Sequence, residues 1–439
     1  MAQLNERKLA LDILLKVKTE NEAVGLSLNR SFGARKSLEK RSRAFITRLV
    51  YGTLENIILL DRVIDQFSRT PVRKMRPQVA TILEMSVYQL MFMDNIPPSA
   101  VCNEAVKTTA KLRLDNLKAF INGVLRNISR NIEDIEYPDI SKDPVKGISI
   151  RYSIPEWVIG IWLGQMSAEE AERLAIVFRR PHGIYIRCNT NILSPAALRA
   201  RLKQDGIIVE TCEDWPEYTL RISGIDNVES VRGFEEGWFY VQDLSCMLSG
   251  EMYGLKGGER VLDMCAAPGG KSINAAMILS GLGGGSVDSQ DVTDAKTDLI
   301  RENIKRLKID NINVRTFDSC VEDEEQAEKY DLVIADVPCS GLGIIGRKPD
   351  ILLKRKPEDI PELVRLQKCI TENAAKAVKK DGKLVYSTCT ICRAENEEMT
   401  KWIEDKLGLV KEMEKLTLPG IDGECDGFFT AVFRKQGSR

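Results

Sequence analysis

Histidine is almost absent from this sequence. The 439 residues include a single one, His182, which removes Ser-His-Asp and Cys-His mechanisms from consideration. Zinc is not expected either, since the eleven cysteines are odd in number and mostly scattered, and a single CxxC pair with a single histidine offers too few ligands. That pair is Cys389 and Cys392. We therefore expect reduced thiols and no metal site, with one or two of the thiols available for catalysis.

Long apolar runs are also missing. No stretch of roughly 18 apolar residues occurs, and no basic segment followed by an apolar one opens the chain. With 43% hydrophobic and 29% charged residues, the composition is that of a globular protein outside the membrane. We expect a cytoplasmic protein that is long enough for two or three domains.

Two common phosphate-binding fingerprints are absent as well. Residues 261–272 read as a strand, a tight loop and a helix start, but Cys265 stands where a P-loop needs its first glycine. The later glycine-rich run misses the dinucleotide fingerprint, because Ser286 occupies the place of the third glycine. The loop still predicts a small-molecule cradle, since adjacent glycines let backbone N–H groups approach a ligand and a helix N-terminus favours an anion.

The first third of the chain reads as helix, with Gly52 and Pro97-Pro98 as its main expected interruptions. Residues 1–140 hold 22 basic and 16 acidic side chains, so this part carries +6 and the remainder −7. Charge alone leaves two interpretations open, a surface for a polyanion or simply solvated helix faces. We expect domains at residues 1–140, 141–235 and 236–439, and a small α/β unit in the middle one.

From residue 236 onward, strand and helix patterns alternate. This alternation predicts crossover connections and a mostly parallel, doubly wound, Rossmann-like α/β sheet. In such a sheet ligands collect beyond the carboxyl ends of the strands. The expected strands are residues 260–263, 286–289, 312–317, 332–336, 383–387 and 428–433.

Acids and thiols follow these expected strands. Asp291 lies 20 residues beyond Lys271, a spacing that suits an acid bonded to ribose hydroxyls, although Asp288 competes for this role. Asp318 could equally be a helix cap. Asp336 is followed by Pro-Cys339, and a second thiol, Cys389, ends the next strand. Either thiol alone would be interpreted as a buried cysteine in a turn, but two of them at neighbouring strand ends indicate chemistry.

Residues 263–272, DMCAAPGGKS, resemble the S-adenosylmethionine loop of the Sun (NOL/NOP) family of RNA (cytosine-5)-methyltransferases. Residues 43–52, 82–90, 96–107 and 120–126 resemble the NusB-like RNA-binding fold. The resemblance spans almost the whole chain and is to RsmB-type enzymes, NusB–Sun fusions that methylate small-subunit (16S) ribosomal RNA. Arg35, Lys36, Lys40, Arg41 and Arg43 form a basic cluster that suits RNA phosphates, and a solvated helix start explains it equally well. A further basic stretch at residues 347–356 suits an RNA backbone and matches the Arg-x-Pro-Asp of the family.

The resemblance also assigns the site. Cys389 is implied to be the nucleophile that adds to carbon 6 of cytosine, Cys339 to assist release of the product, and Asp336 to bond the pyrimidine edge. Thiolate addition makes carbon 5 nucleophilic and so divides one difficult step into two easier ones. The implied S-adenosyl-L-methionine contacts are Cys265, Ala266, Ala267, Pro268, Gly269, Gly270, Lys271, Asp291, Asp318 and Asp336.

The implied partner is RNA, most directly small-subunit ribosomal RNA, with neither DNA nor a membrane, and we expect a monomer. One alternative is a non-catalytic RNA-binding factor, which the first third of the chain suggests and the combination of Cys389, Cys339 and Asp336 disfavours. Another is a methyltransferase acting on protein or on tRNA. The cysteine pair argues against a protein substrate, whereas the sequence does not separate tRNA from ribosomal RNA.

Overall fold

The structure, a computed structural model, describes residues 5–35, 38–180, 183–225 and 227–437. Lys36, one of the expected phosphate contacts, and His182 lie outside these residues. The chain forms two compact units: a helical unit of residues 1–179 with 347–355, and an α/β unit of residues 180–346 with 356–439. The expected division at residues 140 and 235 is finer than this and stays a prediction. Residues 141–179, expected in the middle domain, belong to the helical unit.

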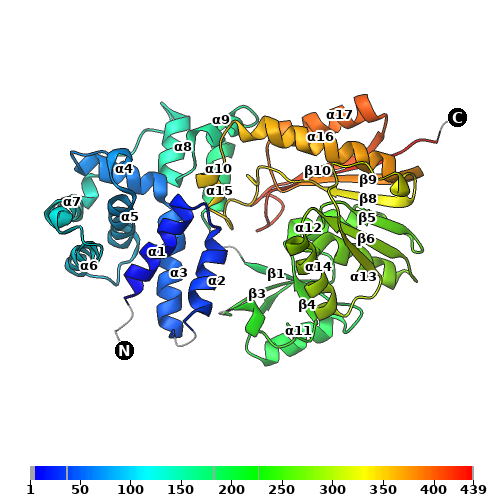
Figure 1. Cartoon of the computed structure of the whole chain (residues 1–439), viewed down its shortest axis with the longest axis horizontal. Helices are drawn as coiled ribbons and strands as arrows, with labels where there is room; N and C mark the ends of the chain where they lie inside the picture. The colour runs from blue at the N-terminus through cyan, green and yellow to red at the C-terminus, as the bar shows by residue number, and fades with distance from the viewer. Residues whose placement is uncertain (1–4, 36–37, 181–182, 226, 438–439) are drawn as a thin grey trace. The chain divides into compact units, whose positions relative to one another are not determined.

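The helical unit contains the α-helices that the apolar periodicity predicts (Figure 1). Their bounds are α1 Glu6–Thr19, α2 Val24–Gly33, α3 Lys40–Glu55, α4 Ile57–Phe67, α5 Pro77–Phe92, α6 Pro98–Lys111, α7 Lys118–Arg130, α8 Pro144–Tyr152, α9 Glu156–Leu163, α10 Ala168–Phe178 and α15 Ile351–Lys354. Short 3-10 turns lie at η1 Val72–Lys74, η2 Asp115–Leu117 and η3 Ile132–Asp134.

Leucine, isoleucine and valine side chains from α1 to α7 form one buried core in the helical unit. Pro77 and Pro98 each stand in the first turn of their helices, where the missing N–H breaks no hydrogen bond. The basic stretch near residue 350 also belongs here: Leu353 packs on the core, and Lys354 Nζ donates to Glu22 O at 3.2 Å and to Asp350 Oδ2 at 2.7 Å.

Gly52 does not interrupt the helix as expected but lies inside α3. A Cβ atom built at Gly52 would lie 2.0 Å from Cζ of Tyr88 on α5. The glycine is therefore needed for close approach of two helices and not as a break, a distinction that the local sequence does not contain.

The α/β unit begins with a small antiparallel sheet in the order β2-β3-β1-β4, covered by α11 Pro195–Gln204. Its strands are β1 Ile184–Cys188, β2 Ile208–Glu210, β3 Thr219–Ser223 and β4 Phe239–Val241. Asn189, just after β1, donates its side-chain N–H groups to Gly237 O at 2.9 Å and Leu307 O at 2.8 Å. The second bond reaches the last residue of α14 Asp294–Leu307, so a buried amide joins this small sheet to the rest of the unit.

The large sheet has the order β10-β11-β9-β8-β5-β6-β7. Its strands are β5 Arg260–Asp263, β6 Ser286–Asp291, β7 Ile312–Thr316, β8 Tyr330–Asp336, β9 Val378–Thr388, β10 Val410–Thr417 and β11 Phe428–Arg434. Strands β5 to β9 pair in parallel, whereas β10 and β11 pair antiparallel at one edge. The prediction of a mostly parallel Rossmann-like sheet is confirmed.

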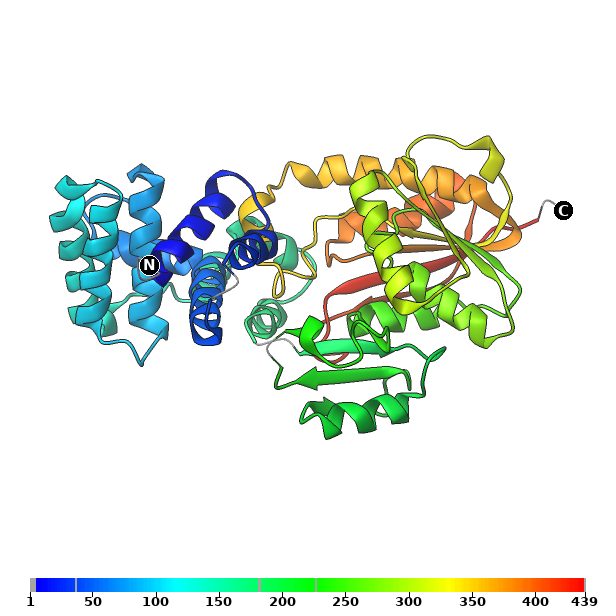
Figure 2. The same ribbon diagram turned by 60° about the horizontal axis from the view of Figure 1, so that its bottom comes forward.

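Helices cover both faces of the large sheet (Figures 1 and 2). On one face, α16 Asp359–Ala377 and α17 Glu397–Leu407 cover a core that includes Leu262, Val333 and Leu384. On the other, α13 Gly270–Gly281 and α14 Asp294–Leu307 cover Val261, Val287 and Ile334, and α12 Leu244–Glu251 packs beside α13. Adjacent strand residues are buried on opposite faces, which is why the strands read as continuous apolar runs.

All six strands expected after residue 236 are present in the large sheet, and β10 is the strand of this sheet that sequence reasoning missed. Its sequence, VKEMEKLT, is half charged and largely exposed. It becomes a strand because β11 offers it a free edge, with register pairs from Val410↔Arg434 to Thr417↔Phe428. Within the described ranges, no helix combines the length and the apolar character that crossing a bilayer requires.

We predict that Gly52→Ala lowers the free energy of unfolding of the full chain by about 1–3 kcal/mol, because the added methyl group overlaps the Tyr88 ring. Gly123→Ala is the matched control: this glycine is exposed on α7, and nothing lies within 4 Å of an added Cβ. That variant should gain about 0.5–1 kcal/mol from helix propensity. Denaturant unfolding of both variants checks this, and equal effects of the two would contradict the packing argument.

Candidate active site

The parallel strands bring the predicted residues to one edge of the large sheet. Asp263 at the end of β5 is in register with Ser289 and Ile334, and Asp336 at the end of β8 is in register with Ser387. Because parallel strands end on the same side, the loops after β5, β6, β7, β8 and β9 meet there. The candidate site is built from these loops.

The loop after β5 contains residues 264–269 and leads into α13. Its turn is closed by a hydrogen bond from Gly269 N to Ala266 O at 2.6 Å, and Ala266 N donates to Gln290 O of β6 at 3.0 Å. Gly269 has φ 107°, which only glycine adopts without strain. No side chain caps α13, so its first N–H groups keep their capacity for an anionic ligand.

A buried polar network fixes the base of this loop. The carboxylate of Asp263 accepts from Ser272 Oγ at 2.6 Å, and Ser289 Oγ donates to Ser272 Oγ at 2.7 Å. Burial raises the pKa of Asp263 to about 7, although the bond from Ser272 opposes this rise. Ser319 Oγ, after β7, donates to Met264 O at 2.5 Å. Three strands thereby hold the loop in one conformation.

Asp291, at the end of β6, contacts the loop directly. Its carboxylate accepts from Ala267 N at 3.0 Å, from Val292 N at 2.8 Å and from Lys296 Nζ at 2.9 Å. Lys296 on α14 is a charged neighbour that sequence reasoning did not identify. Asp318, after β7, is exposed, and its Oδ1 accepts from Cys320 N at 2.9 Å. It lies in the loop of the neighbouring strand, where its side chain also stabilises a local turn.

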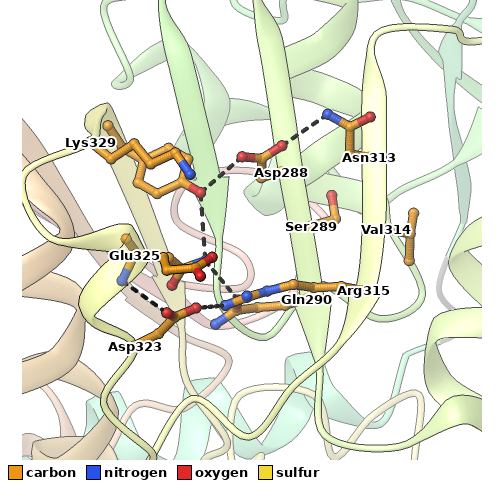
Figure 3. Close-up of a pocket in the computed structure, with 11 residues that line it drawn as sticks. Asp288, Ser289, Gln290, Asn313, Val314, Arg315, Asp323, Glu325 and Lys329 are labelled. Carbon is orange, nitrogen blue, oxygen red and sulfur yellow. Dashed lines mark hydrogen bonds and ion pairs between the residues drawn. The ribbon is translucent and has the colours of Figure 1, made fainter.

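Asp288, the competing acid, lies in a different environment. Its carboxylate accepts from Arg260 Nη2 at 2.6 Å, Tyr330 OH at 2.8 Å and Asn313 Nδ2 at 3.0 Å. Figure 3 shows it in a polar pocket of about 200 Å³ between β6, β7 and the start of β8. The pocket is lined by Asp288, Ser289, Gln290, Asn313, Val314, Arg315, Asp323, Glu325, Gln326, Lys329 and Tyr330. None of the predicted site residues lines it.

A buried ion pair joins the loop to the end of β8. Lys271 Nζ bonds Asp336 Oδ2 and lies 4.7 Å from the centroid of the Phe428 ring, while Ser387 Oγ donates to Asp336 Oδ1 at 2.8 Å. Burial lowers the pKa of Lys271, but the charge of Asp336, its hydrogen bond, and the neighbouring Cys246 and Tyr253 together outweigh burial and hold the pKa above its usual value. Lys271 is therefore a cation at neutral pH. Ser387 and Phe428 are contacts that the sequence did not indicate.

The two predicted thiols are in contact. Cys339 Sγ and Cys389 Sγ lie 3.1 Å apart, although 50 residues separate them in the chain. Cys339 is buried, whereas Cys389 is only partly buried. The hydrogen bond with Cys389, followed by burial, raises the pKa of the Cys339 thiol well above its usual value. The site thus combines one protonated, enclosed thiol with a second, more accessible thiol beside a carboxylate and a buried cation.

Two family patterns match the chain. The one described as "16S rRNA methyltransferase RsmB/F" matches residues 252–434, and the one described as "NusB family" matches residues 4–130. The probable ribosomal RNA small subunit methyltransferase B of Bacillus subtilis (strain 168) is 34% identical over 456 residues, which cover 100% of both chains.

Solved structures share the fold. The crystal structure of PH0851 matches with a TM-score of 0.81 at 23% identity, covering 99% of both chains. The structure of NSun6 from Pyrococcus horikoshii with SFG matches with a TM-score of 0.57 at 21% identity, covering 65% of this chain and 99% of that one.

We predict that iodoacetamide alkylates Cys389 faster than Cys339 near neutral pH. The thiolate is the reactive form, and the raised pKa and the burial of Cys339 keep its thiol protonated and enclosed. Peptide mapping by mass spectrometry over a pH series measures both rates in one sample. Faster labelling of Cys339 would contradict the described difference between the two thiols.

Proposed function

The chain belongs to the family of ribosomal RNA small subunit methyltransferase B, and from this premise we propose that it methylates carbon 5 of a cytosine in small-subunit (16S) ribosomal RNA through a covalent Cys389–cytosine intermediate. The observation that carries the proposal is the 3.1 Å contact between Cys389 and Cys339 beside Asp336. A non-catalytic RNA-binding factor needs neither thiol. The ribosomal RNA named for the Bacillus subtilis relative favours this substrate over tRNA.

S-adenosyl-L-methionine is the methyl donor, and when bound it supplies a methyl group activated on a sulfonium. The residues present fit it: Asp291 offers a carboxylate at the place of a ribose acid, and the uncapped N-terminus of α13 suits a carboxylate group. Residues Cys265, Ala266, Ala267, Pro268, Gly269, Gly270 and Lys271 would form the cradle, and Asp318 would hold the adenine amino group.

The chain's own residues account for the chemistry at the base. Cys389, as a thiolate, adds to carbon 6, which makes carbon 5 nucleophilic. Asp336 accepts from the amino group, and from ring nitrogen 3 once that nitrogen is protonated in the adduct. A carboxylate has about four lone-pair sites, so its bonds to Lys271 and Ser387 leave acceptor capacity. After the methyl group has moved, a base removes the carbon-5 proton, and the electron pair of that bond expels the Cys389 sulfur from carbon 6. Cys339, protonated because its pKa is raised, can donate to the departing sulfur.

The helical unit would supply RNA affinity in this scheme. Arg35, Lys40 and Arg41 are exposed at and before the start of α3, where RNA phosphates could approach them. A target base within a duplex would have to be flipped out, whereas one in a loop is reached at lower cost. We infer a monomer that acts in the cytoplasm, where ribosomal RNA is its substrate.

The first prediction concerns the cofactor acid. Asp291→Ala should weaken S-adenosylmethionine binding by about 1.5–3 kcal/mol, since a ligand hydroxyl pair loses its charged acceptor. Asp288→Ala is the matched control: it removes an acid three residues away that bonds Arg260, Tyr330 and Asn313. That control should lower stability and leave affinity unchanged. Calorimetric titration of both variants decides between the two acids, and the reverse pattern would assign Asp288.

The second prediction separates the two thiols. Cys389→Ser should abolish methylation and form no covalent species, because an alcohol is a far poorer nucleophile than a partly ionised thiol. Cys339→Ala should still attack and then stall, which leaves a protein–RNA complex that survives denaturing electrophoresis. If Cys389→Ser gave this protein–RNA complex instead, the roles of the two thiols would be reversed. If neither variant gave it, the cytosine-5 mechanism itself would be refuted.

A further inference from the structure

Glu395 is a fully buried carboxylate next to the thiols that has no role in the chemistry described above. It ends η6 Arg393–Glu395, the 3-10 turn between β9 and α17, and it is 0% exposed. A buried carboxylate is costly unless hydrogen bonds compensate it. Its hydrogen-bond partners therefore indicate what the fold gains by keeping it there.

The first set of partners lies in the loop that carries Cys339. Ser340, the next residue, donates its backbone N–H to Glu395 Oε1 at 2.8 Å and its hydroxyl to Glu395 Oε2 at 2.5 Å. Gln367 of α16 donates through Nε2 to Glu395 Oε1 at 2.9 Å and to Pro338 O at 3.0 Å. The residues on both sides of Cys339 are thus tied to this one turn.

The second set lies in the loop that carries Cys389. Thr390, the next residue, has its hydroxyl 2.8 Å from that of Ser340. Asn396, directly after Glu395, donates to Thr390 O at 2.9 Å and accepts from Thr388 Oγ1 at 2.6 Å. The residues flanking Cys389 are therefore held by the same turn, and Ser340, Thr390, Glu395 and Asn396 are all buried.

We propose that Glu395 is a positioning residue that sets the separation of the Cys339 and Cys389 sulfurs, an inference that rests on the proposed cytosine-5 chemistry. The two thiols come from separate strands and act in turn on one base, so each loop must present its sulfur at a fixed place. Rate is sensitive to such placement, since a shift of about 1 Å costs on the order of 100-fold. Glu395 supplies this constraint. Its carboxylate bonds the Cys339 loop at two atoms of Ser340, and the next residue, Asn396, bonds the Cys389 loop.

The spacing can be measured without RNA. Diamide accepts two electrons and two protons from a pair of thiols as they form a disulfide, and peptide mapping gives the rate for Cys339 with Cys389. In wild type this disulfide should form readily. In Glu395→Ala its rate of formation should be at least about tenfold lower, and in Ser340→Ala the rate should be intermediate. Glu398→Ala, an exposed acid three residues on, is the matched control and should match wild type. Unchanged cross-linking in Glu395→Ala, or none in wild type, would overturn the inference.

Activity provides the second measurement. Glu395→Ala should lower the single-turnover rate of RNA adduct formation on the order of 100-fold, with S-adenosylmethionine affinity unchanged. Glu395→Gln should restore most of the rate, because its carbonyl still accepts from Ser340 N and its amide can donate to the Ser340 hydroxyl. If both variants lost cofactor binding equally, Glu395 would be merely structural and the inference would be overturned. If Glu395 governed cross-linking but wild type formed no RNA adduct, the positioning role would stand and the proposed function would fail.

Discussion

The buried Lys271–Asp336 ion pair is the interaction on which the site depends. Lys271 lies in the first turn of α13, which follows the loop after β5, and Asp336 ends β8. The pair therefore links this loop to the strand that leads to Cys339. The side chains of Lys271 and Asp336 are 10% and 29% exposed. Removing Asp336 would leave the charge of Lys271 unpaired in the interior, which costs up to about 3–5 kcal/mol. The pair therefore fixes the loop after β5 against the end of β8.

The contrast between the two thiols follows from that arrangement. Asp336 is fixed through Lys271 and Ser387, and its strand leads to Cys339, which is buried and whose sulfur contacts that of Cys389. Gly343 N donates to Cys389 O at 3.0 Å, and a Cβ at Gly343 would lie 2.0 Å from Gly427 O. This backbone contact requires glycine, and it draws the two loops together. Cys339 is enclosed and Cys389 is more accessible, and a division of environments of this kind is how proteins give like groups different tasks.

Sequence reasoning predicted what local pattern and strand polarity determine. The loop after β5 and the residues after β6, β8 and β9 converge because parallel strands end at one edge, a rule that needs no knowledge of side-chain contacts. Sequence reasoning missed the features that depend on contacts between residues far apart in the chain. Gly52 was expected to break a helix because its partner, Tyr88, is 36 residues away, and β10 is a strand only because β11 leaves an edge to pair with. Glu395 gave no signal, since its role depends on Ser340, 55 residues earlier in the chain.

Residue spacing along the chain does not distinguish Asp288 from Asp291, whereas the geometry of their hydrogen bonds does. Three residues separate the two acids, and side chains an odd number of positions apart on a strand point to opposite faces. The donors to Asp288 come from β5, β7 and β8, and the hydrogen bonds of Asn313, Tyr330 and Arg260 outweigh burial and keep its pKa below its usual value. Asp291 instead bonds Ala267 of the cradle. A count of residues admits either acid, whereas the donors differ: those of Asp288 join neighbouring strands of the sheet, and that of Asp291 belongs to the loop after β5.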